Sequence, residues 1–398
     1  MPKPNDTSRS PVALDQDSTL IAVIEMSQTS WLVAGIVPGV ARQPLKKLGA
    51  EPDALLALLE RWRAEAGKAG RPIRRVAVAY EAGRDGFWLA RWLRVRGVEA
   101  HVIHPTSVAV ARTHRRAKTD RLDTQLLKRA FLGWLRGEPD HCTMAAIPTP
   151  AEEDARRPQR EREALVGEKT RIVNRLKAAL ARLGISGFKP TLRKAGGRLA
   201  ALRTPDGEPV PPNTLAELRR DMARLALVRE QIAEIEAARR HRLEQAPDHS
   251  PGQAADKGPH AMLELVARVR GIGIDTAELL VNEVLARNLR DRRAVARYGG
   301  LTGAPDESGK RRREKGLARA GNARVRGAMI QLAWRFLMFQ KDCDLARWYR
   351  ARTEEIAGDR RVIRKKLIVA LARKLLIALW RMATTGEIPN GLVLRPAA

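Results

Sequence analysis

Apolar runs of strand length alternate with runs of helical period over the first 135 residues, and this alternation predicts a sheet with helices packed on it. Residues 19–37 hold two β-rich apolar runs separated by the polar stretch MSQTS, which is the pattern of a hairpin. Further strands are predicted at residues 73–81 and 101–105, and helices at residues 51–67, 86–97 and 118–135. We therefore expect a mixed α/β domain at residues 18–150, after a tail at residues 1–17.

Two long charged helices are predicted next. Residues 152–183 have helical spacing, and residues 214–246 form a second helix that Thr214 and Glu217 open as a capping box. Leu and Ile seams with Arg and Glu flanks are typical of two helices folded back on one another, so we expect an antiparallel coiled coil at residues 151–246. A linker, a mostly helical last domain with one glycine-rich loop, and a short tail are predicted at residues 247–260, 261–390 and 391–398.

A large excess of positive charge, +29 over 398 residues, is concentrated in the last third of the chain. Guanidinium groups present a planar fork of donors to phosphate oxygens, so nucleic acid is the expected partner. The densest basic run, residues 310–326, lies beside glycines and an asparagine and favours a phosphate-binding surface, although a solvated helix face is the alternative. Its candidate residues are Lys310, Arg311, Arg312, Arg313, Arg319, Asn322, Arg324 and Arg326.

A glycine loop forms a second candidate for phosphate binding. Residues 265–284 place Gly271 and Gly273 between two apolar helical stretches, which is the form of a helix-hairpin-helix. Such glycines let backbone N–H groups at the start of the second helix meet a phosphate. An ordinary turn between helices is the alternative reading.

Several classes of protein are disfavoured by what the sequence lacks. The N-terminus has no apolar signal core and no stretch is long and apolar enough to span a bilayer, so we expect a cytoplasmic bacterial protein that does not enter a membrane. Cys142 and Cys343 stand far apart without the spacing of a zinc site, and are expected to be buried thiols. No GxxxxGK[ST] or HExxH motif is present, which argues against ATPases and zinc hydrolases.

Four carboxylates stand where a sheet and a helix could bring them together. Glu25 ends the first predicted strand, Glu81 ends a later one, and Asp120 and Asp123 lie three apart on one helix face. A cluster of this kind needs cations, and Mg²⁺ suits hard oxygen ligands and can activate a phosphodiester. The alternative is that the two aspartates are solvated helix acids paired with neighbouring cations.

Ser308 is a candidate nucleophile. It lies in a Gly/Pro-rich loop just before the arginine cluster. A loop serine is usually structural, but cations that hold a phosphate would stabilise both a serine alkoxide and the charged transition state of phosphoryl transfer.

Four segments of the chain resemble one known family: VAYEAGRDGFWLARWLRVRG, HPTSVAVARTHRRAKTDRLDTQLLKR, VRGIGIDTAELL and ARYGGLTGAPDESGKRRREKGLARAGNARVRGAM. Together they resemble the DEDD transposases of bacterial insertion sequences, the IS-one-ten family. The resemblance implies an α/β RNase H-like (RuvC-like) N-terminal domain that binds Mg²⁺, a helical coiled-coil insertion, and a C-terminal transposase domain with a catalytic serine. Glu81, Asp120 and Asp123 match the second, third and fourth acids, and Ser308 matches the serine of the family's SG loop.

One position departs from the family pattern. The first acid is normally an aspartate after a glycine, and here Glu25 follows an isoleucine. Asp15 and Asp17 are weaker substitutes because they precede the apolar strand. The extra methylene of glutamate changes the reach of the carboxylate by about an ångström.

The resemblance implies a transposase that cuts donor and target DNA and joins the strands, guided by a structured bridge RNA and working as a homo-oligomer, a dimer or tetramer. Two alternatives stay open. One is a Holliday-junction resolvase, which would use the acids alone and not Ser308. The other is a nucleic-acid-binding remnant of a transposase, catalytically impaired because Glu25 replaces the aspartate.

Overall fold

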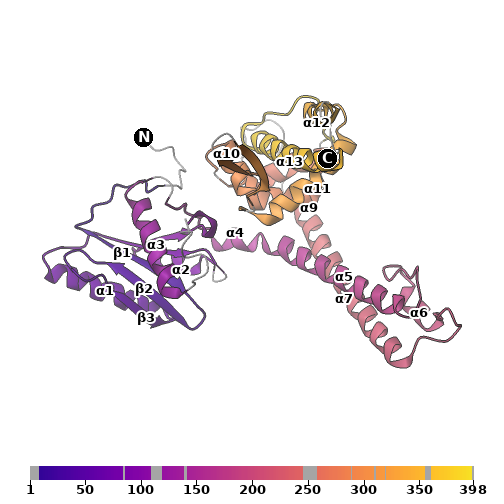
Figure 1. The fold of residues 1–398 in the computed structure, drawn as a ribbon, viewed down its shortest axis with the longest axis horizontal. Coiled ribbons are helices and arrows are strands. Elements are labelled where there is room, and N and C mark those ends of the chain that lie inside the picture. Colours follow the sequence, from indigo (N-terminus) through magenta and orange to yellow (C-terminus); the bar gives the residue numbers. More distant parts are fainter. Residues whose placement is uncertain are drawn as a thin grey trace. The chain divides into compact units, whose positions relative to one another are not determined.

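Two compact units make up the chain in a computed structural model (Figure 1). The first unit comprises Met1–Pro150 and Arg287–Val393, and the second comprises Ala151–Ala286 and Leu394–Ala398. The structure describes residues 9–83, 86–108, 119–138, 141–244, 258–287, 289–308, 311–318, 320–354 and 360–396. Among these, no helix has the length and apolar content to cross a membrane.

A five-stranded mixed sheet forms the start of the first unit, in the order β3-β2-β1-β4-β5. The strands are β1 (Thr19–Met26), β2 (Ser30–Ile36), β3 (Leu45–Gly49), β4 (Arg75–Glu81) and β5 (Glu99–Ile103). β2 pairs antiparallel with β1 and β3, whereas β4 pairs parallel with β1 and β5. The predicted mixed α/β character of this region is confirmed, and β3 is a strand that the sequence analysis did not predict.

Helices cover both faces of the sheet. Ile24 and Tyr80 face the core beneath α1 (Pro52–Lys68) and α2 (Trp88–Val95), and α3 (Asp120–Leu135) covers the other face. There Val23 and Ala79 pack in one cluster with Phe131. β1 is apolar at every position from Leu20 to Ile24 because it is buried on both sides, as expected of a central strand.

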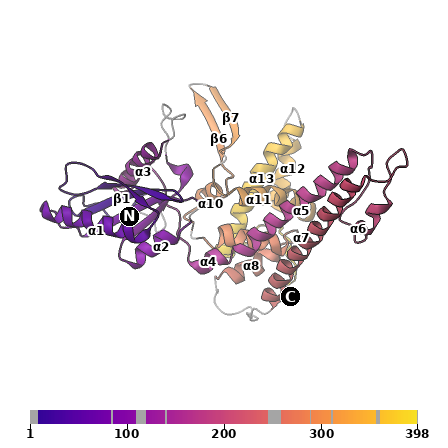
Figure 2. The same cartoon turned by 90° about the horizontal axis from the view of Figure 1, so that it is seen from below.

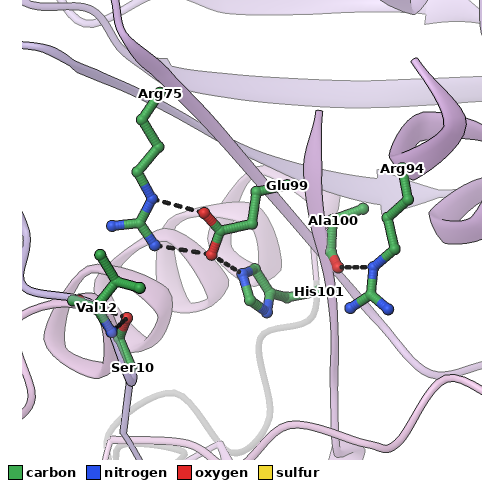
Figure 3. A network of polar contacts seen from close by, with 7 residues as sticks. All are labelled: Ser10, Val12, Arg75, Arg94, Glu99, Ala100 and His101. Carbon is green, nitrogen blue, oxygen red and sulfur yellow. Dashed lines mark hydrogen bonds and ion pairs between the residues drawn. The ribbon is translucent and has the colours of Figure 1, made fainter. Parts of the chain in front are cut away.

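A polar network joins the beginnings of β4 and β5 (Figure 3). Arg75 donates to both oxygens of Glu99, Nε at 2.6 Å and Nη2 at 2.7 Å, and His101 Nε2 lies 2.7 Å from Glu99 Oε1. The imidazole ring centroid is 4.8 Å from the ring centroid of Trp134. Burial raises the pKa of Glu99, but hydrogen bonds from His101 and Arg75 outweigh this effect and lower it to about 2.

The later part of the first unit is helical with one β-hairpin. Its elements are α10 (Arg292–Tyr298), β6 (Gly303–Ser308), β7 (Arg311–Leu317), α11 (Ala323–Phe339), α12 (Asp344–Glu354) and α13 (Arg360–Thr385). α13 packs against α10, α11 and α12. The hairpin corrects the expectation that this region is helical apart from a glycine loop. Its strands are polar and charged, so no alternation of apolar residues marks them in the sequence.

The second unit is a helical hairpin with a helical base (Figure 2). Its helices are α4 (Pro150–Asp154), α5 (Arg157–Ala181), α6 (Ala195–Arg198), α7 (Pro212–Glu244), α8 (Pro259–Ala267) and α9 (Ile274–Leu280), which continues into a π-helical turn, η4 (Val281–Leu285). α5 and α7 run antiparallel around a seam that includes Ile172, Leu176, Leu225 and Val228. Residues 245–257, most of the predicted linker, lie outside the described residues.

Both cysteines are buried free thiols, as predicted. Burial raises the pKa of the Cys142 thiol to about 12. Cys142 Sγ donates to the carbonyl of Ala130 in α3, so the side chain belongs to the packing beneath the sheet.

Candidate catalytic and nucleic-acid-binding site

Glu25 and Glu81 occupy neighbouring positions on the two central parallel strands. Ile24 pairs with Tyr80 in the parallel register of β1 and β4, so Glu25 and Glu81 are the next residues along each strand. Since successive side chains alternate between the faces of a sheet, Glu25 shares the face of Val23, which α3 covers. Glu25 is half-buried and Glu81 is exposed. The strand ends therefore set two carboxylates side by side.

Asp120 and Asp123 lie in the first turn of α3. Thr119 caps this helix, its hydroxyl accepting from the amide of Leu122 at 3.3 Å. Asp120 is exposed and Asp123 is half-buried. Asp123 precedes the buried Leu127 by one helical turn, so it extends the stripe with which α3 packs on the sheet. The helix thus carries two acids on the element that covers the face of Glu25.

The carboxylate oxygens of these four acids suit Mg²⁺, but the four side chains do not form a closed metal site. Carboxylate oxygens are the ligands that a hard divalent cation prefers. Within the described part of the chain, however, no three His, Cys, Asp or Glu side chains stand close enough to hold a metal ion. The strand register makes Glu25 and Glu81 neighbours, and among the described residues neither aspartate of α3 completes a group of three metal ligands with them.

Ser308 is the last residue of β6, at the turn of the β6–β7 hairpin. It is the Cα partner of Arg311, the first residue of β7. This corrects the prediction that Ser308 lies in an irregular loop: antiparallel pairing fixes its backbone. Arg312 and Arg313 follow in β7, opposite Glu307 and Asp306.

The remaining predicted phosphate-binding residues of the basic run differ in their surroundings. Asn322 caps α11, where its side-chain oxygen accepts from the amides of Arg324 and Val325. Arg326 Nη1 donates to the carbonyl of Ala320 at 3.2 Å. Asn322 and Arg326 therefore have structural partners that the sequence did not reveal. Lys310 and Arg319 lie outside the described residues.

Gly271 and Gly273 lie in the turn between α8 and α9. Gly271 has a φ of +98°, a conformation that favours glycine. Gly273 is the N-cap of α9 and its carbonyl accepts from the amide of Ala277. Asp275 in the first turn of α9 places a carboxylate at this helix start, where it binds Arg239 at 2.7 Å. Two helices joined by a glycine turn are present, as the predicted helix-hairpin-helix requires, and phosphate binding there stays a prediction.

An exposed tryptophan near the two strand ends was not singled out from the sequence. Trp88 opens α2, which follows β4, and it is 39% exposed. Its ring centroid lies 6.2 Å from that of buried Trp31, which is the Cα partner of Met26 beside Glu25. The exposure of Trp88 could not be read from the sequence, where it is one of several apolar residues in a helical run.

Comparisons with known proteins identify the family. Residues 263–349, which include the glycine turn, Ser308 and the basic run, match the family described as Transposase IS116/IS110/IS902. Over 396 residues the chain is 39% identical to the protein named "Putative transposase y4rJ" of Sinorhizobium fredii (strain NBRC 101917 / NGR234). The aligned region covers 98% of each of the two chains. The chain therefore belongs to the IS116/IS110/IS902 family of transposases, enzymes that move DNA segments.

Proposed function

We propose that this transposase cuts and rejoins DNA strands by phosphoryl transfer, with Ser308 as the nucleophile and Glu25, Glu81, Asp120 and Asp123 as the acidic site. The observation that carries the proposal is the parallel register of β1 and β4, which makes Glu25 and Glu81 neighbours. Two adjacent carboxylates at the ends of central strands repel one another, and this cost is accepted where charge is needed for chemistry.

An RNase H-like fold for the N-terminal region is part of the proposal. The order β3-β2-β1-β4-β5, with an antiparallel meander extended by two parallel strands, supports it. So does the helix that carries Asp120 and Asp123 on the face of Glu25.

The reaction balances without a nucleotide cofactor. Ser308 Oγ would form a bond to phosphorus as one bridging P–O bond of the DNA strand breaks, and the serine proton passes to the leaving oxygen. The strand stays linked to Ser308 through a phosphodiester, the same type of bond as the one that was broken. A hydroxyl of the recipient strand then attacks this ester, which restores Ser308 and makes the new phosphodiester.

Mg²⁺ is the proposed metal, held by Glu25, Glu81, Asp120 and Asp123 once α3 and the strand ends come closer. When bound, it would neutralise charge on the phosphate under attack. Calorimetry can measure the binding of Mg²⁺ or Mn²⁺ to the chain without DNA. This measurement tests the metal site independently of catalysis.

A structured bridge RNA is the proposed guide, and a homo-oligomer, dimer or tetramer, acting on bacterial DNA in the cytoplasm is the proposed working form. The resemblance of the four sequence segments to guided transposases supports both. The basic run that surrounds the β6–β7 hairpin supplies positive charge suited to an RNA or DNA backbone.

In the experiment that tests this proposal, purified protein is mixed with donor and target DNA duplexes, with and without RNA transcribed from the non-coding DNA beside the gene. We expect RNA-dependent strand exchange, and a covalent protein–DNA adduct that Ser308→Ala abolishes. Ser10→Ala is the matched control, since this serine lies in the N-terminal segment, outside the acidic site, the basic run and the glycine turn. A covalent protein–DNA adduct formed by the Ser308→Ala variant would mean that another residue is the nucleophile.

Other outcomes identify the rival functions. Cleavage of four-way junctions that survives Ser308→Ala identifies a resolvase. Tight nucleic-acid binding with no strand exchange under any divalent metal identifies a catalytically impaired remnant.

A further inference from the structure

Residues 182–203, the first part of the segment that joins α5 to α7, carry a dense positive charge; we call them the hairpin tip. Its six cations are all exposed, and no Asp or Glu occurs in it. They are Arg182, Lys189, Arg193, Lys194, Arg198 and Arg203. The tip therefore has a local charge of +6, and residues 204–211, which complete the segment, add two acids, Asp206 and Glu208.

Several cations on the helices of the hairpin are used differently. Arg175 binds Asp221 and Arg162 binds Glu236, with N–O distances of 2.6 Å in both pairs. Arg239, which is only 3% exposed, binds Asp275 and Glu278. Among the described residues, no carboxylate forms an ion pair with any of the six tip cations. Arg203 donates from Nη1 to the carbonyls of Ala200 and Leu202. The other five tip cations remain available to another molecule.

The tip is packed onto the hairpin core. Ile185 and Leu199 belong to the same buried cluster as Leu176 of α5. Arg229 of α7 donates from Nη1 to the carbonyl of Thr191 at 3.1 Å. The cations thus project from a folded element, which lowers the entropy that would be lost on binding a rigid partner.

Charge decides what this surface can bind. A second copy of a chain with a net charge of +29 repels a positive surface on average, whereas a nucleic-acid backbone attracts it. Among nucleic acids, DNA is the substrate of the family to which the chain belongs. We propose that the hairpin tip binds the sugar–phosphate backbone of duplex DNA. The contact extends the proposed function, on which it rests only in taking duplex DNA as the substrate.

The test compares two triple variants of the full-length protein that remove equal charge. Arg193, Lys194 and Arg198 are replaced by Ala in the tip variant. Lys46, Lys47 and Lys68, exposed cations of β3 and α1, are replaced by Ala in the control variant. The dissociation constant is measured by fluorescence anisotropy across a salt series, with a duplex DNA of fixed length and with a structured RNA of equal phosphate number.

We expect the tip variant to lower the slope of log affinity against log salt for DNA by about 2 to 3, because each lost phosphate contact contributes about 0.9. The control variant should keep the original slope. An unchanged slope in the tip variant, an equal change in the control, or a loss confined to RNA would overturn the proposal.

Two safeguards keep the result interpretable. Thermal unfolding of the tip variant checks that the helical unit is intact, and if it is not, the pair Arg193→Gln and Lys194→Gln replaces the triple variant with an expected slope change of about 2. The assay contains no strand transfer, so failure of the serine mechanism leaves the DNA-binding result unaffected. If the tip variant kept the salt slope of the unmodified protein and the unmodified protein exchanged strands as proposed, only the tip contact would be refuted.

Discussion

Arg175 and Asp221 join the two long helices of the second unit through two hydrogen bonds of 2.6 Å. The Asp221 side chain is 3% exposed, and Arg224 also binds it, at 3.0 Å. Hydrogen bonding from Arg175 lowers the pKa of this carboxyl below its usual value although burial opposes the shift. A buried carboxylate held between two guanidinium groups fixes the register of α5 against α7.

Removing this carboxylate should weaken the helical unit. Asp221→Ala is expected to lower the free energy of unfolding by about 2 kcal/mol, below the usual cost of breaking a buried pair because both arginines are about half exposed. Denaturant unfolding followed by circular dichroism measures the change. Arg347→Ala, which removes an exposed pair with Asp344 in α12, is the control and should change the free energy much less, because solvent screens this pair.

Acid should loosen the sheet through Glu99. Its pKa is lowered to about 2, so the ionised form stabilises the fold above its usual value of 4.5, and this contribution is lost as the pH falls from 4.5 towards 2. Because the side chain is 36% exposed, we expect a loss of about 1 to 2 kcal/mol across that window. Glu99→Gln should show a flatter dependence of the unfolding free energy on pH.

Glu60→Gln is the comparison for Glu99. It removes an exposed carboxylate that lies 3.7 Å from Arg63 on α1, and it should follow the unmodified protein across the same pH window. Identical pH curves for Glu99→Gln and Glu60→Gln would show that the Arg75–Glu99 contact adds nothing to stability in acid.

Apolar periodicity predicted the elements that bury a face. β1 and β4 could be read from uninterrupted apolar runs, and α1, α3 and α7 from helical spacing, all within a few residues of their bounds. β3, β6 and β7 could not be predicted in this way. These strands are rich in polar and charged residues and form by backbone pairing with a neighbouring strand, so their sequences carry no alternating apolar pattern.

The candidate site was predictable only to the level of elements. That Glu25 and Glu81 end strands could be read from the sequence, but their adjacency depends on β1 pairing with β4. Arg239 looks like a solvated helix cation, yet it is buried because Asp275 and Glu278 come from a helix beyond the linker. Contacts between residues far apart in the chain decide which charges are structural.

Glu25 distinguishes an active site from a remnant. If it serves the reaction, Glu25→Gln should reduce strand exchange roughly 100-fold or more, since the negative charge is lost beside Glu81. Glu25→Asp keeps the charge and should retain or improve the rate. Glu65→Gln, an exposed carboxylate on α1, is the control for both. Full activity of Glu25→Gln in a gel assay of strand exchange would remove Glu25 from the site.

The β6–β7 register predicts that the three consecutive arginines contribute unequally to DNA binding. Arg311 is the Cα partner of Ser308, whereas Arg312 and Arg313 stand opposite Glu307 and Asp306. Cross-strand partners of opposite charge generally attract one another, so we expect a carboxylate to compete with phosphate at the last two positions and not at the first. Arg311→Ala should therefore lower the log–log salt slope for duplex DNA by about 0.9, and the other two single variants by less.

The same series separates backbone contact from base reading. Phosphate contacts position the duplex without reading it, so Arg311→Ala should weaken binding to unrelated sequences by the same factor. Ser308→Ala, which removes no charge, is the control and should leave the salt slope unchanged. Equal slopes for the three arginine variants would mean that the acids of β6 do not compete with phosphate. A changed choice of DNA site in Arg311→Ala would mean that this arginine reads bases, and would count against guidance by RNA pairing.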